Sequence, residues 1–151
     1  MKKVVINRMK MELDARSVNE SFARTIVAAF AAQLDPTLEE IDDLKTAVSE
    51  AVTNCIVHAY SRTKKEELRT KNDRILIECA LYKDRSIIIT ITDFGIGISN
   101  IEKALEPFFT TKPDQERSGM GFTVMQSFMT DLRVVNGSDC GCIVEMSKVF
   151  G

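Results

Sequence analysis

Two helix-start signals in the first forty residues constrain the fold more than any other feature of the sequence. "SVNE" (17–20) and "TLEE" (37–40) have the spacing of a capping box, in which an N-cap hydroxyl and a glutamate three residues later satisfy free backbone N–H groups. Pro36 ends the first helical pattern just before the second box. The sequence therefore predicts two consecutive helices.

Apolar residues recur with helical spacing after both boxes. In the first helix they are Val18, Phe22, Ile26, Phe30 and Leu34, and in the second Ile41, Leu44, Val48, Val52, Cys55 and Ala59. We expect each set to be the buried stripe of its helix. A second face of the first helix consists of Asn19, Glu20, Ala23, Arg24, Val27 and Ala31. Small residues around one arginine suit a partner surface, and a solvated helix face explains them equally well.

Segments rich in β-branched residues surround these helices. Strands are expected at 4–13, 75–82, 86–92, 132–136 and 142–150, and a short helix at 121–130. The elements do not alternate strictly, which favours an α/β two-layer sandwich, with a mixed sheet and helices on one face. Residues 61–74 are highly charged and residues 104–121 have no clean period, so we expect two loops, the second a lid or binding loop. Without repeats or linkers, residues 1–151 are expected to form one domain.

The bulk properties argue against several classes of protein. The net charge is −2, so no global field attracts nucleic acid or an anionic membrane. The longest apolar run, residues 25–32, is too short to span a bilayer, and the N-terminal segment lacks the apolar region of a signal peptide. We therefore expect a cytoplasmic protein that contacts neither nucleic acid nor membrane directly.

The cysteines do not indicate a metal site. They are Cys55, Cys79, Cys140 and Cys142, and the chain has one histidine. No zinc-site spacing can be assembled from these residues. We expect reduced thiols in core or strand positions.

The segment "ITITDFGIGIS" (89–99) contains the Asp-Phe-Gly triplet with which eukaryotic-type protein kinases hold magnesium. The Gly-rich loop, the Val-Ala-Ile-Lys strand and the His-Arg-Asp loop of those kinases are absent, as is a Walker A loop. The segment also reads as Asp93-x-Gly95-x-Gly97 at a strand end. There a carboxylate can accept a hydrogen bond from an exocyclic amino group, and glycines let the backbone approach a flat ring. Alone, this pattern also fits a plain turn.

Two further motifs accompany this segment. Glu50 and Asn54 lie four residues apart on the second predicted helix, so they share one face, away from the apolar stripe. "RSGMGF" (117–122) places Gly119 and Gly121 before the short helix, where free N–H groups and the positive dipole end suit phosphate. Taken singly, the first pair also fits a solvated face and the second a permissive helix start.

In this order, Glu-x-x-x-Asn, Asp-x-Gly-x-Gly and Gly-x-Gly resemble the N, G1 and G2 boxes of the GHKL (Bergerat-fold) ATPase superfamily, which includes gyrase, MutL and histidine kinase ATP-binding domains. "ARSVNESFAR", "AAFAAQLDPT", "VSEAVTNCIVHAY", "DFGIGI" and "FFTTKPDQERSGMGF" resemble the anti-sigma factor serine protein kinases of spore-forming bacteria, over nearly the whole chain. The loop at 61–74 is longer than this family's pattern leads us to expect.

The resemblance implies a fold, cofactors, an activity and partners. The fold would be the Bergerat ATP-binding fold, with ATP and Mg2+ as cofactors. The protein would bind and inhibit a sporulation sigma factor of the sigma F type. As a serine kinase it would phosphorylate a serine of the anti-anti-sigma factor that antagonises it, and it would form a homodimer.

The resemblance also assigns roles to the motif residues. Asn54 would ligate the magnesium ion that bridges the ATP phosphates, and Glu50 would act as general base toward the substrate serine. Asp93 would bind the adenine amino group, and Gly95 and Gly97 would line the base pocket. Backbone contacts to the phosphates would come from Ser118, Gly119, Met120, Gly121 and Phe122.

Other positions have more peripheral roles by the same resemblance. Arg117 would neutralise charge on the γ-phosphate, because a guanidinium meets phosphate in bidentate fashion; a lid surface charge is the alternative. The lid would include Thr110, Thr111 and Lys112. Arg24 would contact protein partners. His58 is expected to be a structural or pocket-edge residue and not a phosphate acceptor.

One position departs from the family pattern. The family tends to carry threonine where this chain has Cys142, and a thiol supports the adenine-binding aspartate less well than a hydroxyl. Three alternatives to the kinase remain open: a stress-response relative, an ATP-gated anti-sigma module without transferase activity, and an ATP hydrolase. Retention of Glu50 argues against the module, and the hydrolases need additional domains.

Overall fold

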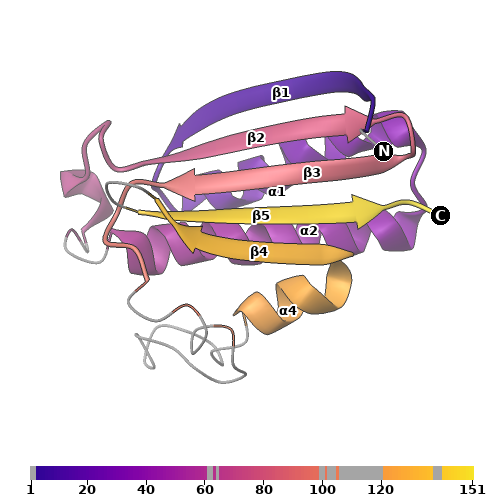
Figure 1. Ribbon diagram of the computed structural model, residues 1–151. Coiled ribbons are helices and arrows are strands. Elements are labelled where there is room, and N and C mark those ends of the chain that lie inside the picture. Colours follow the sequence, from indigo (N-terminus) through magenta and orange to yellow (C-terminus); the bar gives the residue numbers. More distant parts are fainter. Residues whose placement is uncertain are drawn as a thin grey trace.

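The computed structural model describes residues 3–60, 63, 65–98, 101, 105, 121–137 and 141–151. Within them, five strands form one sheet in the order β1-β2-β3-β5-β4 (Figure 1). The strands are β1 (Val5–Asp14), β2 (Arg74–Tyr82), β3 (Ser86–Asp93), β4 (Asp131–Asn136) and β5 (Cys142–Val149). The helices are α1 (Val18–Ala31), α2 (Leu38–Asn54) and α4 (Gly121–Phe128), with 3₁₀ turns η1 (Ala32–Leu34) and η3 (Glu66–Leu68) and a π-helical turn η2 (Cys55–Ala59). None of these helices is long and apolar enough to cross a membrane.

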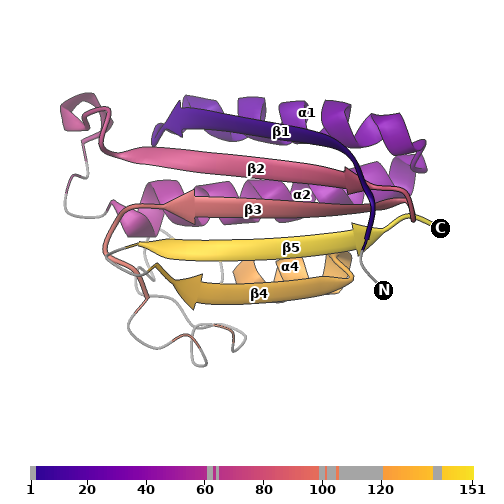
Figure 2. The same cartoon turned by 45° about the horizontal axis from the view of Figure 1, so that its top comes forward.

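Helices α1, α2 and α4 lie on one face of the sheet, so the predicted two-layer α/β sandwich is confirmed (Figure 2). The prediction of a mixed sheet is wrong, because every described strand pairing is antiparallel. Two helices connect β1 to β2, so the chain returns in the opposite direction. The crossover through α4 does make β4 parallel in direction to β3, but β5 lies between them and pairs antiparallel with both.

The inward face of the sheet supplies the centre of the core. Alternate residues of the neighbouring strands β2 and β3 are fully or almost fully buried: Ile75, Ile77, Cys79 and Leu81 on β2, and Ile87, Ile89 and Ile91 on β3. The predicted stripe of α2 and η2 packs on them, with Leu44, Val48, Val52, Cys55 and Ala59 all buried. This contact fixes α2 on the sheet, while Glu50 and Asn54 on another side of the helix stay half-buried.

The buried face of α1 differs from the one that its large apolar residues predict. Ala23, Val27 and Ala31 are fully buried, whereas Val18 is 75% exposed and Phe22 49% exposed. Small side chains allow the helix to approach its neighbours closely, and of the predicted stripe only Phe30 and Leu34 pack on the core. The suggestion that Ala23, Val27 and Ala31 belong to a partner surface is therefore wrong.

Only one of the two predicted capping boxes forms. Thr37 accepts the N–H of Glu40 at 3.1 Å, and the Glu40 carboxylate accepts the N–H of Thr37 at 2.8 Å. Ser17 has no capping hydrogen bond to its own helix, because its N–H and hydroxyl both donate to the carboxylate of Glu66. A charged acceptor makes a stronger hydrogen bond than a neutral one, and this one comes from a distant segment that the local pattern does not reveal.

Residues 65–69, which we name the clasp, hold the ends of two helical segments. Glu66 binds the start of α1, and Arg69 donates to the carbonyls of Ala15 (2.7 Å), Ile56 (2.9 Å), Tyr60 (3.4 Å) and Thr63 (2.8 Å). Two of these carbonyls belong to the C-terminal end of the long helix formed by α2 and η2, where the helix dipole favours a cation. Part of the charged loop predicted at 61–74 is thus a structural element.

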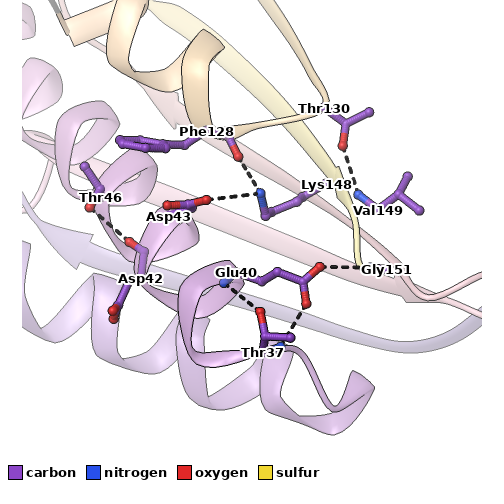
Figure 3. A network of polar contacts seen from close by, with 10 residues as sticks. All are labelled: Thr37, Glu40, Asp42, Asp43, Thr46, Phe128, Thr130, Lys148, Val149 and Gly151. Carbon is purple, nitrogen blue, oxygen red and sulfur yellow. Dashed lines mark hydrogen bonds and ion pairs between the residues drawn. The ribbon is translucent and has the colours of Figure 1, made fainter.

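At the other end of the helical layer, Lys148 joins α4 to α2 (Figure 3). Its Nζ donates to the carbonyl of Phe128 at 2.6 Å and lies 3.9 Å from a carboxylate oxygen of Asp43. The hydroxyl of Thr130 accepts the N–H of Val149 at 3.0 Å. The C-terminal end of α4 is thus anchored to β5 and α2, and its N-terminal residue, Gly121, faces the polar side of α2.

Candidate nucleotide and phosphotransfer site

The N-terminus of α4 lies directly against the polar side of α2. A Cβ placed on Gly121 would lie 3.3 Å from Nδ2 and 3.4 Å from Oδ1 of Asn54, and 3.5 Å from Oε2 of Glu50. Glycine therefore allows the backbone at the start of α4 to approach both side chains. The structure thus brings together a carboxylate, an amide oxygen and a helix N-terminus, which is a suitable set for a base, a metal ligand and an anion.

Asp93 ends β3 as a buried carboxylate, with 5% of the residue exposed. Its Oδ1 accepts the N–H of Gly95 at 3.0 Å and the N–H of Cys142 at 3.2 Å. Burial raises the pKa of Asp93, and these hydrogen bonds, which favour the ionised form, oppose that shift.

The glycines after Asp93 are required by packing of the backbone. A Cβ on Gly95 would lie 2.0 Å from the carbonyl oxygen of Ala59, which accepts the N–H of Ile96 at 3.0 Å. Gly97 has a φ of 75°, a conformation that favours glycine. The segment is therefore held tightly against the end of η2, which fixes the position of Asp93.

The sequence analysis assigned no role at the site to Gly141 or Asn136, which fix the same segment from the other side. Gly141 has a φ of 83°, and a Cβ there would lie only 2.0 Å from the carbonyl oxygen of Asp93. The Asn136 amide accepts the N–H of Ile98 at 2.9 Å and donates to its carbonyl at 2.8 Å. No spacing of residues in the sequence predicts these contacts. The only local signal is a Gly-containing turn between two predicted strands.

Tyr60 is a second residue that the sequence did not indicate. Its hydroxyl accepts the N–H of Phe94 at 2.8 Å and donates to the carbonyl of Arg74 at 2.5 Å. Burial raises the pKa of Tyr60 to about 12, so the phenol stays protonated and keeps donating. The ring of Phe94 lies 4.0 Å from the guanidinium carbon of Arg74, a cation–π contact that gives this phenylalanine a packing role here.

The predicted site residues divide into three groups. Those that the structure places around the ends of α2, β3 and β5 and the start of α4 are Glu50, Asn54, Asp93, Gly95, Gly97, Gly121 and Cys142. The Phe122 side chain packs on the core, so only its backbone is available to a ligand. The remaining predicted residues lie outside the described part of the chain: Thr110, Thr111, Lys112, Arg117, Ser118, Gly119 and Met120.

Arg24 lies apart from this cluster on α1. One of its guanidinium nitrogens is 3.4 Å from a carboxylate oxygen of Glu20 and 3.5 Å from the hydroxyl of Ser49 on α2. Its side chain is 40% exposed, so the head group remains accessible to a partner.

The thiols behave as reduced core residues where the structure describes them. Cys55, Cys79 and Cys142 are buried and form no disulfide. In the described part of the chain, no group of three or more His, Cys, Asp or Glu side chains could hold a metal ion.

The raised pKa of Asp93 makes a prediction about stability. The folded protein binds the Asp93 proton more tightly than the unfolded chain does, so Asp93 favours folding most below the ordinary aspartate pKa, and this contribution is lost as pH rises through the raised pKa. We therefore expect the difference in unfolding free energy, wild type minus Asp93→Asn, to decrease as pH rises from the ordinary aspartate pKa through the raised pKa of Asp93. Denaturant unfolding between about pH 4 and pH 7 measures it.

Asp84→Asn is a control of opposite sign for that measurement. The hydrogen bond from Ser86 lowers the pKa of Asp84, so its contribution is present above the ordinary aspartate pKa and is lost as pH falls. A difference for Asp93→Asn that rises with pH would contradict the assigned direction.

Comparison with known proteins agrees with this geometry. The fold and the cluster define a histidine kinase-like ATPase domain, and the model of the family described as "Histidine kinase-like ATPase domain" matches residues 11–148. An anti-sigma F factor of Clostridium acetobutylicum is 51% identical over 144 residues, which are 95% of this chain and 94% of that protein. One from Caldanaerobacter subterraneus subsp. tengcongensis is 53% identical over 145 residues, covering 96% and 95%. The chain belongs to the anti-sigma F factor family of these ATPase domains.

A solved structure supports the fold independently. The crystal structure of the RsbU and RsbW domains of a Mycobacterium tuberculosis protein matches with a TM-score of 0.67 at 17% sequence identity. The match covers 96% of this chain and 33% of that longer chain. At this identity the likeness concerns the fold alone, and it confirms the expected ATPase fold.

Proposed function

We propose that this protein binds and inhibits a sporulation sigma factor of the sigma F type. We further propose that it uses Mg-ATP to phosphorylate a serine of its antagonist, the anti-anti-sigma factor. The observation that carries the kinase part is the convergence of Glu50 and Asn54 on the glycine at the start of α4. The names of the relatives favour a sigma F type partner over a stress-response sigma factor.

The residues present fit ATP and magnesium. A carboxylate fixed at a strand end by two backbone N–H groups suits the exocyclic amino group of adenine, and this is Asp93. Asn54 supplies a hard amide oxygen next to a helix N-terminus that suits phosphate. Magnesium commonly binds through one or two protein ligands plus phosphate oxygens, so a single Asn54 beside the phosphates is sufficient.

The residues of the chain would act mainly by positioning. Bound magnesium would neutralise phosphate charge during transfer. Glu50, one turn before Asn54 on α2, would accept the proton of the substrate serine, and the free N–H groups at the start of α4 would hold the phosphates. Asp93 would fix the adenine end, and Arg117, outside the described residues, would contact the γ-phosphate.

Partner binding would use the exposed side of α1. Val18 and Phe22 expose apolar surface on a different side of α1, so the proposed partner surface is the side on which Arg24 keeps an accessible guanidinium. We propose that this side contacts the sigma factor and the antagonist, and that the protein acts as a homodimer.

The test is phosphoryl transfer from γ-labelled Mg-ATP to the anti-anti-sigma factor that antagonises this protein. Acid-stable label on an antagonist serine supports the kinase. Acid-labile label on this protein instead would make His58 an acceptor. Bound ATP and a captured sigma factor without any label would favour an ATP-gated anti-sigma module.

A further inference from the structure

We propose that Tyr60 is a positioning residue for adenine recognition, because its hydroxyl holds the ends of β2 and β3 apart and thereby sets the orientation of the Asp93 carboxylate. The sequence analysis assigned no role to Tyr60. The inference rests on the proposed function, since it concerns how the same site reads the base of its nucleotide.

The hydroxyl of Tyr60 lies between two backbone groups of neighbouring strands. It accepts the N–H of Phe94 at 2.8 Å and donates to the carbonyl of Arg74 at 2.5 Å. The last pair of the β2–β3 ladder is Ile75 with Asp93, so Arg74 and Phe94 are the next pair in the same register. A direct hydrogen bond between these two groups would continue the ladder, and the hydroxyl takes its place. Tyr60 therefore ends the pairing of the two strands directly after Asp93.

The hydroxyl is held firmly in this position. Tyr60 is only 6% exposed and belongs to the hydrophobic core, so packing fixes its ring. Its carbonyl accepts the N–H of Thr63 at 3.0 Å and a guanidinium N–H of Arg69, in the clasp, at 3.4 Å. The side chains of Arg74 and Phe94 stay in contact, with 4.0 Å between guanidinium carbon and ring centre, while the hydroxyl separates their backbones. The hydroxyl thus acts as a spacer of fixed position.

Consecutive residues at the end of the long helix hold alternate residues of the segment after Asp93. Tyr60 accepts the N–H of Phe94, and Ala59 accepts the N–H of Ile96 at 3.0 Å. Without the hydroxyl, Ile96 would keep its acceptor, so the later part of this segment would stay in place. The backbone at Phe94 would lose its partner and turn toward another one, because a part-buried N–H that loses its acceptor is costly. The adjoining Asp93 carboxylate would turn with it.

The experiment compares two nucleotides in Tyr60→Phe, a variant that removes the hydroxyl and keeps the ring. Purine riboside triphosphate lacks the 6-amino group, so its binding does not depend on Asp93 as an acceptor. We expect Tyr60→Phe to weaken ATP binding roughly three- to tenfold, the size of one net hydrogen bond, and to change binding of the analogue less than about twofold. Titration calorimetry with Mg2+ measures both affinities.

Tyr82→Phe is the matched control. The chain has two tyrosines, and Tyr82 lies at the opposite end of β2 from Arg74. The control should leave both affinities unchanged. Exchange of the Phe94 amide hydrogen, followed by NMR, reports the hydrogen bond itself. It should be at least about tenfold faster in Tyr60→Phe than in the wild type or the control.

The outcomes are distinct. Equal losses for both nucleotides in Tyr60→Phe would show a general packing effect and overturn the inference. An ATP affinity equal to that of Tyr82→Phe, or unchanged exchange of the Phe94 amide, would also overturn it. A wild type that binds neither nucleotide, or binds both equally well, would overturn the proposed adenine site itself. Selective loss for ATP together with faster exchange supports both.

Discussion

Glu50→Gln is expected to reduce phosphoryl transfer to the antagonist by about 10²–10⁴-fold, the usual contribution of a positioned general base. Glutamine keeps the size of the side chain beside Gly121 but cannot accept the serine proton at neutral pH. ATP affinity and sigma factor binding should change less than about twofold, because neither requires a base. Single-turnover transfer of labelled phosphate, measured with saturating ATP, reports the chemical step.

Glu39→Gln is the matched control, because Glu39 is an exposed glutamate in the first turn of the same helix. It should transfer phosphate at the wild-type rate. Full activity of Glu50→Gln would remove Glu50 from the role of base, and a parallel loss of ATP binding would assign it to the nucleotide pocket instead.

Gly141→Ala is expected to have the largest effect on the fold of the site. The new Cβ would lie 2.0 Å from the carbonyl oxygen of Asp93, on a residue whose φ is 83°. The positive φ costs about 1–2 kcal/mol for alanine, and the overlap with backbone adds about 1–3 kcal/mol. The variant should therefore lose about 2–5 kcal/mol of unfolding free energy and, because Asp93 must shift, most of its ATP affinity. Denaturant unfolding and calorimetry measure the two quantities.

Gly97→Ala separates the cost of the positive φ from the cost of the overlap with backbone. Its φ of 75° is nearly the same, but its Cβ would lie 3.0 Å from the flexible Asn136 side chain and 3.1 Å from the Gly141 carbonyl oxygen. We expect a smaller destabilisation, close to the cost of the positive φ alone. Equal losses of unfolding free energy in the two variants would mean that the close approach of Gly141 to Asp93 adds nothing to the cost of the positive φ.

The sequence predicts strands well here because each is a short β-branched segment with clear boundaries. All five described strands lie within one or two residues of the predicted ranges, and the apolar stripe of α2 is buried as expected. The spacing of Glu50 and Asn54 also predicted a shared face, since a helix places residues four apart side by side. These features depend on local periodicity, which one sequence contains.

The errors concern contacts between distant segments. The large apolar residues predicted the buried face of α1 only in part, because Phe30 and Leu34 pack on the core but Val18 and Phe22 are exposed. The fully buried positions of the helix are Ala23, Val27 and Ala31. The Ser17 cap was wrong because Glu66 competes for the same groups. The π-helical turn η2, whose last residue Ala59 accepts the N–H of Ile96, leaves no periodic signal, so this part of the site emerged only from the structure.

The clasp limits how the chain can be engineered. A connection that only spans two elements tolerates shortening, because the entropy of loop closure changes slowly with length. Deletion of residues 65–69 would instead uncover the start of α1 and the carbonyls at the end of η2, so an affinity tag or a truncation at this place would disrupt both helices. Lys71, which is exposed just beyond the clasp, is a suitable attachment point for a fluorescent label.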